Sequence, residues 1–292
     1  FTTIIAFALK TNDNNLTWAT ENLYSDQVLG ALSTMLSFII ATSLASNTTK
    51  NEAGVGHFGN LNGVIVNLAL FSRSLVTGHA ETFAYRTLPD GLGGTFQITD
   101  MGLVLASVPY IVKYTYRGVD VKIRELPLGA VAPLLKRMDE LVNPGDGRIG
   151  VSPFMAAVMM LGDQIDLWHE KGQIKTPELV VLFGQLNALT GEEGAIGGAV
   201  GYSRPGVFNV MLYVTFAMYF GLLIVSDLVP KNEYNSIWIV GALIITTYGL
   251  FAVSMRYANP FQVRTGNSTQ KPLISATARD TEIAIAGVFA RK

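Results

Sequence analysis

The sequence offers few residues for catalysis or metal binding. Its three histidines, His57, His79 and His169, are far apart, and cysteine is absent. His169 is followed by a glutamate but lacks the second histidine that a helical zinc site requires four residues along. The stretch Gly91-Leu-Gly-Gly94 has no following Lys-Ser or Lys-Thr, so we interpret it as a turn rather than a phosphate-binding loop. We therefore expect no enzyme, no metal site and no resident cofactor.

A different pattern occurs between residues 28 and 44, where large and small side chains separate into stripes. Leu32, Leu36 and Ile40 are spaced by four residues, which places them on one face of a helix. Small or polar residues occupy another face: Gly30, Thr34, Ser37 and Ala41. One interpretation is that the small face packs helices together while the large row meets lipid or protein core. The other is that the large side chains form apolar rings that gate a pore by dewetting.

The composition is that of a membrane protein. Hydrophobic residues make up 49% of the 292 residues and charged residues only 15%, whereas soluble domains carry roughly 25% charged residues. The mean hydropathy is +0.35. The net charge of −1 supplies no field that would hold a nucleic-acid backbone, so we expect lipid and not nucleic acid as a partner.

Four apolar segments predict membrane spans, the first of them incomplete. They are Phe1 to Leu9, Val28 to Leu44, Phe208 to Val229 and Ile237 to Met255. A helical span needs about 20 apolar residues, so we interpret the first segment as the end of a truncated helix. Three other apolar stretches are too short to span and predict helices buried in an extramembrane domain: Gly63 to Val76, Gly102 to Val112 and Pro153 to Leu161.

The positions of Lys and Arg predict the topology of these spans. All of the 21 basic residues except Lys10 and Lys231 lie between the second and third spans or after the fourth. Basic residues near spans tend to stay on the cytoplasmic side. We predict an all-α, multi-pass integral membrane protein with four transmembrane helices and a large helical cytoplasmic domain. Its parts are spans one and two (1–47), the cytoplasmic helical region (48–205), spans three and four (206–257) and a cytoplasmic tail packed on the helical region (258–292).

Helix punctuation is visible within the middle region. Apolar residues at helical spacing predict a helix from Leu126 to Val142, which Asn143-Pro-Gly-Asp-Gly147 ends. Pro153 to Trp168 and Pro177 to Leu189 predict two more. Gly197 and Gly201 are four residues apart, a spacing that permits close helix approach. We expect tight packing or a loop there, with a ligand-facing role as the alternative.

Several motifs in this order resemble the bestrophin family across nearly the whole chain. The resemblance rests on Asn62-Gly-Val-Ile-Val-Asn67, Ser72-Arg-Ser-Leu75, Tyr116-Arg-Gly118, Leu126-Pro-Leu128, Leu186-Asn-Ala-Leu-Thr-Gly-Glu-Glu193 and Ser203-Arg-Pro205. The most specific block lies in the tail. It consists of Ala258-Asn-Pro-Phe261, Lys271-Pro-Leu-Ile-Ser-Ala276 and Arg279-Asp-Thr-Glu-Ile283.

The resemblance implies a homopentameric passive ion channel, with chloride or other anions as the permeant species. In that family the second span of each subunit lines an axial pore, and three rings of large apolar residues form its neck. Mapped onto this sequence, the neck residues are Leu32, Leu36 and Ile40. Polar side chains beside the neck, Ser33, Thr34 and Ser37, would then contact dehydrating ions, with helix packing as the alternative role. A bound chloride is compatible with this function.

Two departures from the family pattern qualify the resemblance. Family members have an arginine and aromatic residues after the second span, where this chain has Leu44-Ala-Ser-Asn-Thr-Thr49 and Gly54-Val-Gly-His-Phe-Gly59. Gln262 to Thr269 contains no acidic residue, so we expect no calcium clasp of the kind that animal members carry. The alternative function is a non-conducting membrane scaffold that keeps the fold.

Overall fold

The computed structural model describes residues 25–76, 85–89, 95–145, 148–201, 206–225, 235–257, 260–261 and 270–289. The described elements are helices, together with one pair of strands. In chain order they are α3 (Ser25–Leu75), β1 (Tyr85–Pro89), β2 (Thr95–Thr99), α5 (Asp100–Arg117), η1 (Ile123–Glu125), η2 (Pro127–Ala130), α6 (Ala132–Val142), α7 (Pro153–Glu170), α8 (Thr176–Gly201), α9 (Gly206–Val225), α10 (Asn235–Tyr257) and α11 (Gln270–Phe289).

The chain divides into two compact units. Unit 1 comprises Phe1–Asn51 and Tyr202–Asn259, and unit 2 comprises Glu52–Gly201 and Pro260–Lys292. Helix α3 begins in unit 1 and continues without a break into unit 2. The assignment of residues 1–47 and 206–257 to the membrane, and of 48–205 and 258–292 to the cytoplasm, stays a prediction.

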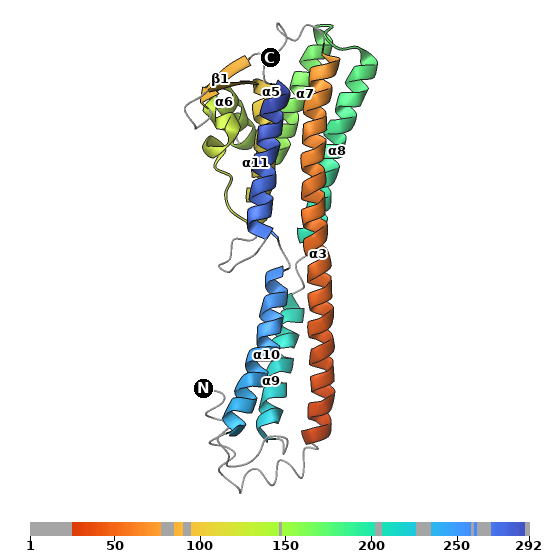
Figure 1. The fold of residues 1–292 in the computed structure, drawn as a ribbon, viewed down its shortest axis with the longest axis vertical. Coiled ribbons are helices and arrows are strands. Elements are labelled where there is room, and N and C mark those ends of the chain that lie inside the picture. Colours follow the sequence, from red (N-terminus) through yellow and green to blue (C-terminus); the bar gives the residue numbers. More distant parts are fainter. Residues whose placement is uncertain are drawn as a thin grey trace. The chain divides into compact units, whose positions relative to one another are not determined.

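Unit 1 is built from the first half of α3 together with α9 and α10, which lie side by side (Figure 1). Its buried side chains form one cluster that contains residues of all three helices: Leu29, Leu36, Ile40, Leu212, Phe216, Tyr219 and Phe251. The helices contain the predicted segments 28–44 and 237–255 and most of 208–229, so the prediction of helix there is confirmed. The predicted first span, Phe1 to Leu9, lies outside the described residues.

Unit 2 is organised around α5, whose residues Met101 to Pro109 are all buried. The N-terminus of this helix is capped by Thr99, whose Oγ1 accepts a hydrogen bond from the Gly102 amide at 3.0 Å. Its C-terminus ends at Gly118, which has φ +67°, a conformation that glycine adopts without strain. Helices α7, α8 and α11 pack around α5, and α11 runs beside it in Figure 1.

Three helices of unit 2 differ in extent from the predictions. Gly63 to Val76 is the end of α3 rather than a separate helix, because Phe58, Leu61 and Ile65 bury a continuous face across the glycine-containing stretch. The helix predicted from Leu126 begins only at Ala132, after the 3-10 turn η2. Helix α8 continues beyond Leu189 to Gly201.

One hairpin is an addition to the all-α prediction. Strands β1 and β2 pair antiparallel, with Tyr85 opposite Thr99 and Pro89 opposite Thr95. Five residues per strand are too few for alternation to stand out from the surrounding helical patterns. The turn predicted at Gly91 to Gly94 lies outside the described residues, between the two strands.

Candidate functional site

The first half of α3 has one buried face, and this face fixes the rotation of the helix within unit 1. Leu29, Leu36 and Ile40 are 2%, 1% and 8% exposed and belong to the cluster shared with α9 and α10. Ser43 and Asn47 continue the same face at helical spacing and are also buried. Five side chains on one stripe therefore point into unit 1.

A polar contact ties this face to α10. The side-chain nitrogen Nδ2 of Asn47 donates to the backbone oxygen of Ser254 at 2.8 Å and to its Oγ at 3.1 Å. Both residues are buried among apolar side chains. Because an unpaired amide is costly in such surroundings, this pair favours one rotation of α3 over its alternatives.

The predicted neck residues lie on or beside this buried face. Leu36 and Ile40 pack inside unit 1, and Leu32 is half-buried against the same cluster. The packing therefore matches the interpretation in which the large row meets protein core. The assignment of Leu32, Leu36 and Ile40 to a pore neck remains a prediction.

The exposed face of α3 carries a different set of side chains. Phe38 is 69% exposed, the largest value for a large apolar side chain in the described part of α3. Of the predicted polar residues, Thr34 and Ser37 are exposed and Ser33 is half-buried. The hydroxyl of Thr34 donates to the Gly30 carbonyl at 2.9 Å, and that of Thr42 to the Phe38 carbonyl at 2.8 Å.

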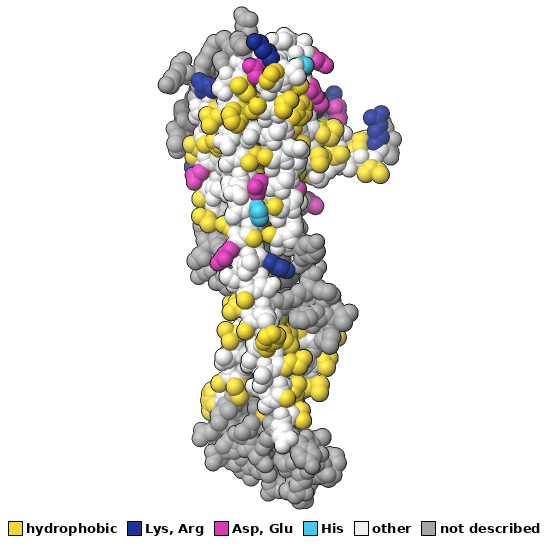
Figure 2. Space-filling model, turned by 90° about the vertical axis from the view of Figure 1, so that its right-hand side faces the viewer, with side chains coloured by type: hydrophobic (Ala, Val, Ile, Leu, Met, Phe, Trp, Pro, Cys, Tyr) yellow, Lys and Arg dark blue, Asp and Glu magenta, His cyan; other side chains and the backbone are white. Residues whose placement is uncertain are grey.

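The exposed face is uncharged, although little of it is covered by protein. Helix α3 contains the one described segment that is long and apolar enough to cross a membrane, Gln27–Leu75, and only 22% of its most apolar window is buried. Shorter apolar stretches, Leu212–Leu222 and Gly241–Ser254, occur in α9 and α10. On the face seen in Figure 2, charged side chains gather over unit 2, whereas apolar side chains and uncharged atoms cover the described part of unit 1.

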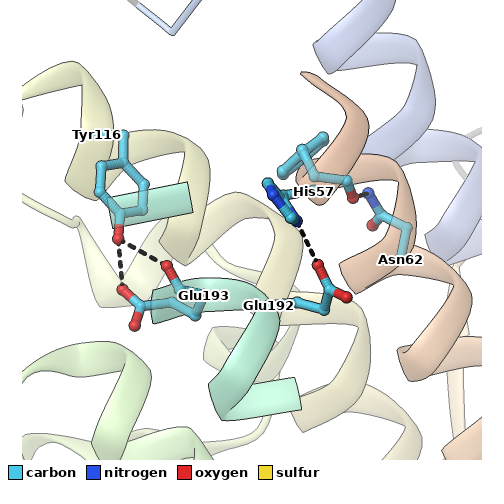
Figure 3. A network of polar contacts seen from close by, with 6 residues as sticks. His57, Asn62, Tyr116, Glu192 and Glu193 are labelled. Atoms are coloured by element: carbon cyan, nitrogen blue, oxygen red, sulfur yellow. Dashed lines mark hydrogen bonds and ion pairs between the residues drawn. The ribbon is translucent and has the colours of Figure 1, made fainter. Parts of the chain in front are cut away.

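In unit 2, α8 presents two adjacent carboxylates to two different helices (Figure 3). Glu192 contacts Nδ1 of His57 on α3 at 2.8 Å, and the pair is partly buried. Glu193 accepts a hydrogen bond from the Tyr116 hydroxyl of α5, also at 2.8 Å. Burial, together with this bond, raises the pKa of Tyr116 above its ordinary value, so the hydroxyl stays a donor.

The contact between α8 and α5 is close at a glycine. A Cβ atom at Gly197 would lie 2.8 Å from the Tyr116 hydroxyl oxygen. By contrast, a Cβ at the next residue, Gly198, would meet nothing within 4 Å. The prediction of tight packing is therefore confirmed at Gly197. The surroundings of Gly201 lie outside what the structure describes.

Residues of the tail motifs anchor unit 2. Phe261 is fully buried, and its ring centroid lies 5.5 Å from that of Phe58 and 5.7 Å from that of Tyr116. Its backbone oxygen accepts a hydrogen bond from Nε of Arg117. Thr281 of α11 donates to Oδ1 of Asn62 on α3 at 2.9 Å. These contacts join segments that are more than 100 residues apart in the sequence.

The histidines do not form a common site in the described residues. His57 pairs with Glu192, His169 is half-buried at the end of α7, and His79 lies outside the described residues. Among the residues that the structure describes, no group of three or more His, Asp or Glu is placed to hold a metal. Sequence analysis missed the link between His57 and Glu192, because nothing in their spacing of 135 residues indicates contact.

Comparison with known proteins identifies the fold. No protein-family model matches the sequence, and no curated protein does. Among solved structures, a bacterial bestrophin homologue from Klebsiella pneumoniae matches with a TM-score of 0.69 and 14% identity, covering 98% of this chain and 95% of that one. A variant of the Klebsiella homologue has a TM-score of 0.68, 13% identity and coverage of 98% and 94%. A structure described as a membrane protein has a TM-score of 0.68, 13% identity and coverage of 98% and 95%.

These values establish the fold over nearly the whole chain. The resemblance inferred from the order of motifs is confirmed at the level of the fold.

Proposed function

We propose that this chain, which has the fold of the bestrophin homologues, is a passive ion channel with a pore lined by α3. The observation that carries the proposal is the long, uncharged and largely unburied apolar face of α3. A helix with such a face is stable only against lipid or against other protein. In a symmetric ring of subunits, part of this face would meet the axis and part the neighbouring subunits.

Five copies related by an axis would bring the α3 helices together around it. The homopentamer is an inference from the resemblance. In this arrangement α9 and α10 would be the third and fourth of four spans, and the chain would cross the membrane several times. Unit 2 would lie in the cytoplasm, as the distribution of Lys and Arg indicates.

Phe38 is our candidate for the narrow point of the pore. It is the most exposed large apolar residue on the described part of α3, and a ring of such side chains would exclude water when closed. Thr34 and Thr42 flank it one turn away on either side and supply hydroxyl groups. Leu36 and Ile40 would face away from the pore that Thr34, Phe38 and Thr42 line, and would pack α3 against α9 and α10.

The charge of the lining does not favour cations over anions. Cation-selective pores commonly carry rings of Asp or Glu, and α3 contains neither between Gln27 and Asn51. The Thr34 and Thr42 hydroxyls donate to carbonyls of their own helix. Contact with an anion would require each hydroxyl to rotate and give up that bond. Binding at the lining would therefore be weak, which suits permeation.

Purified protein in planar lipid bilayers tests this proposal. We expect current under a chloride gradient, with a reversal potential close to the chloride equilibrium potential. A reversal potential close to the cation equilibrium value would leave a channel but overturn anion selectivity. An intact oligomer that passes no current at any voltage would instead support the non-conducting scaffold.

A further inference from the structure

A buried lysine lies near the C-terminal end of α5. Lys113 is only 7% exposed, and its Nζ lies 5.7 Å from the ring centroids of both Tyr110 and Tyr114. Such distances allow cation–π attraction. Among the residues that the structure describes, no carboxylate pairs or hydrogen-bonds with this ammonium group. A buried cation without an anionic partner is unusual in proteins.

A second cation lies one turn further along the same helix. Arg117 is half-buried, and its Nε donates to the backbone oxygen of Phe261 at 3.1 Å. Its terminal nitrogens have no acceptor among the described residues. Residues four apart on a helix are neighbours, so the two cations repel each other. This repulsion, after burial, contributes to lowering the pKa of Lys113.

The carboxylates on the surrounding helices are already engaged. Glu282 of α11 accepts a hydrogen bond from the Tyr110 hydroxyl at 2.8 Å, and Glu193 of α8 accepts one from Tyr116. Arg279 of α11 adds a further positive charge near Tyr110. Neither Glu282 nor Glu193 contributes to the pKa shift of Lys113, whose causes are burial and Arg117.

The C-terminus of α5 offers only partial compensation. The dipole of a helix places about half a negative charge at its C-terminal end. Lys113 and Arg117 together carry two full positive charges. The rings of Tyr110 and Tyr114 add attraction but no net charge. The positive charges of Lys113 and Arg117 are therefore only partly neutralised by their surroundings in unit 2.

We propose that Lys113 and Arg117 together bind a small inorganic anion. The ammonium group would supply a point charge, and the terminal nitrogens of Arg117 would supply directed donors, a combination suited to chloride or to phosphate oxygen. The half-buried Arg117 gives the anion access from solvent. The site belongs to unit 2, does not rest on the channel function and can be tested without any measurement of current.

Thermal unfolding of the full chain in detergent tests the site. Sodium gluconate, chloride and phosphate would be compared at equal ionic strength for the wild type, Lys113→Met and the control Lys136→Met. Lys136 is an exposed lysine, with 78% of its side chain accessible. In the wild type, Tm should rise with chloride or phosphate and then saturate, because a ligand that binds only the folded state stabilises it.

Each variant has a distinct expected result. Lys113→Met should have a higher Tm than the wild type in gluconate, because a buried unpaired charge is removed. Its response to chloride and phosphate should be lost, whereas Lys136→Met should respond like the wild type. A saturable response that survives in Lys113→Met, or a wild type that responds to neither anion, would overturn the proposal. A response to one anion alone identifies which of the two the site takes.

The pH dependence of Tm gives an independent readout. The pKa of Lys113 is lowered on folding, so the unfolded chain binds more protons than the folded chain at pH values below the ordinary lysine pKa. Wild-type Tm in gluconate should therefore rise as the pH approaches that ordinary value from below. Tyr110 and Tyr116 have raised pKa values, so their hydroxyls stay protonated over this rise. Lys113→Met should show a flatter profile. Chloride or phosphate should flatten the wild-type profile too, since an anion favours the protonated amine, and no flattening by either anion would contradict the site.

Discussion

The two halves of α3 belong to one helix but stand in different chemical surroundings. In unit 1 the helix carries no charge between Gln27 and Thr49, packs through Leu36 and Ile40, and leaves Phe38 exposed. In unit 2 it buries Phe58, Leu61, Ile65 and Leu68 and contacts α8 through His57. The second half is therefore a core helix, whereas the first half has a free face. Only a helix with a free face can line a pore between subunits.

Replacing the same residue type in each half tests this contrast most strongly. Phe58→Ala should lower the free energy of unfolding by about 3–5 kcal/mol, because it leaves a cavity against Phe261. Phe38→Ala should change it by less than about 0.5 kcal/mol, since an exposed side chain leaves no cavity. Chemical denaturation of the detergent-purified protein measures both. Equal losses would show that the two faces are equally buried in the assembly.

Within the first half, the buried face should be distinguishable from the exposed one. Leu36→Ala should lower stability by about 2 kcal/mol, toward the lower end of the range for buried leucine, because lipid tails are as apolar as the protein interior. The same measurement applies, with Phe38→Ala as the matched control. A neutral Leu36→Ala would contradict the packing of this residue against α9 and α10.

A pair of adjacent glycines sharpens the account of the contact between α5 and α8. Gly198→Ala should stabilise the protein by about 0.5–1 kcal/mol, since alanine favours the helix and its Cβ meets nothing. Gly197→Ala should be at least about 1 kcal/mol less stable than Gly198→Ala, because its Cβ would displace the Tyr116 hydroxyl from Glu193. The difference in Tm between the two variants is the measurement. Equal values would show that Tyr116 moves without cost.

A modest effect is expected from the hydrogen bonds between Asn47 and Ser254 in unit 1. Asn47→Ala removes the hydrogen bonds to Ser254 and should cost about 0.6–1.7 kcal/mol, as measured for such bonds between membrane helices. The matching side-chain hydrogen bond in unit 2 is the one that Thr281 donates to Asn62, and its loss can be compared with that of the Asn47 bonds. A larger loss for Asn47→Ala than for Leu36→Ala would show that polar contacts, rather than packing, fix the rotation of α3.

Much of the helix pattern could be predicted from the sequence, because apolar length and helix punctuation are local properties. Val28 to Leu44 and Ile237 to Met255 are helical as predicted, and Pro153 begins a helix. The continuity of α3 through Gly54 to Gly63 could not be predicted, since it depends on burial of Phe58 and Leu61 against distant segments.

The candidate site was harder to predict than the helices. A row such as Leu32, Leu36 and Ile40 is equally compatible with a pore and with a core, and only the positions of α9 and α10 distinguish the two. Contacts such as that of His57 with Glu192 join residues 135 positions apart, so they carry no local pattern. The buried Lys113 likewise depends on helices that the sequence places far away.

The most direct test of the central claim uses the absence of cysteine from this sequence. Single variants Phe38→Cys, Thr42→Cys, Leu36→Cys and Ile40→Cys would be treated in bilayers with a charged, water-soluble thiol reagent while current is recorded. The account predicts that the reagent changes the current through Phe38→Cys and Thr42→Cys and leaves Leu36→Cys and Ile40→Cys unaffected. Modification at Leu36→Cys and Ile40→Cys but not at Phe38→Cys would contradict it and place the large apolar row in the pore.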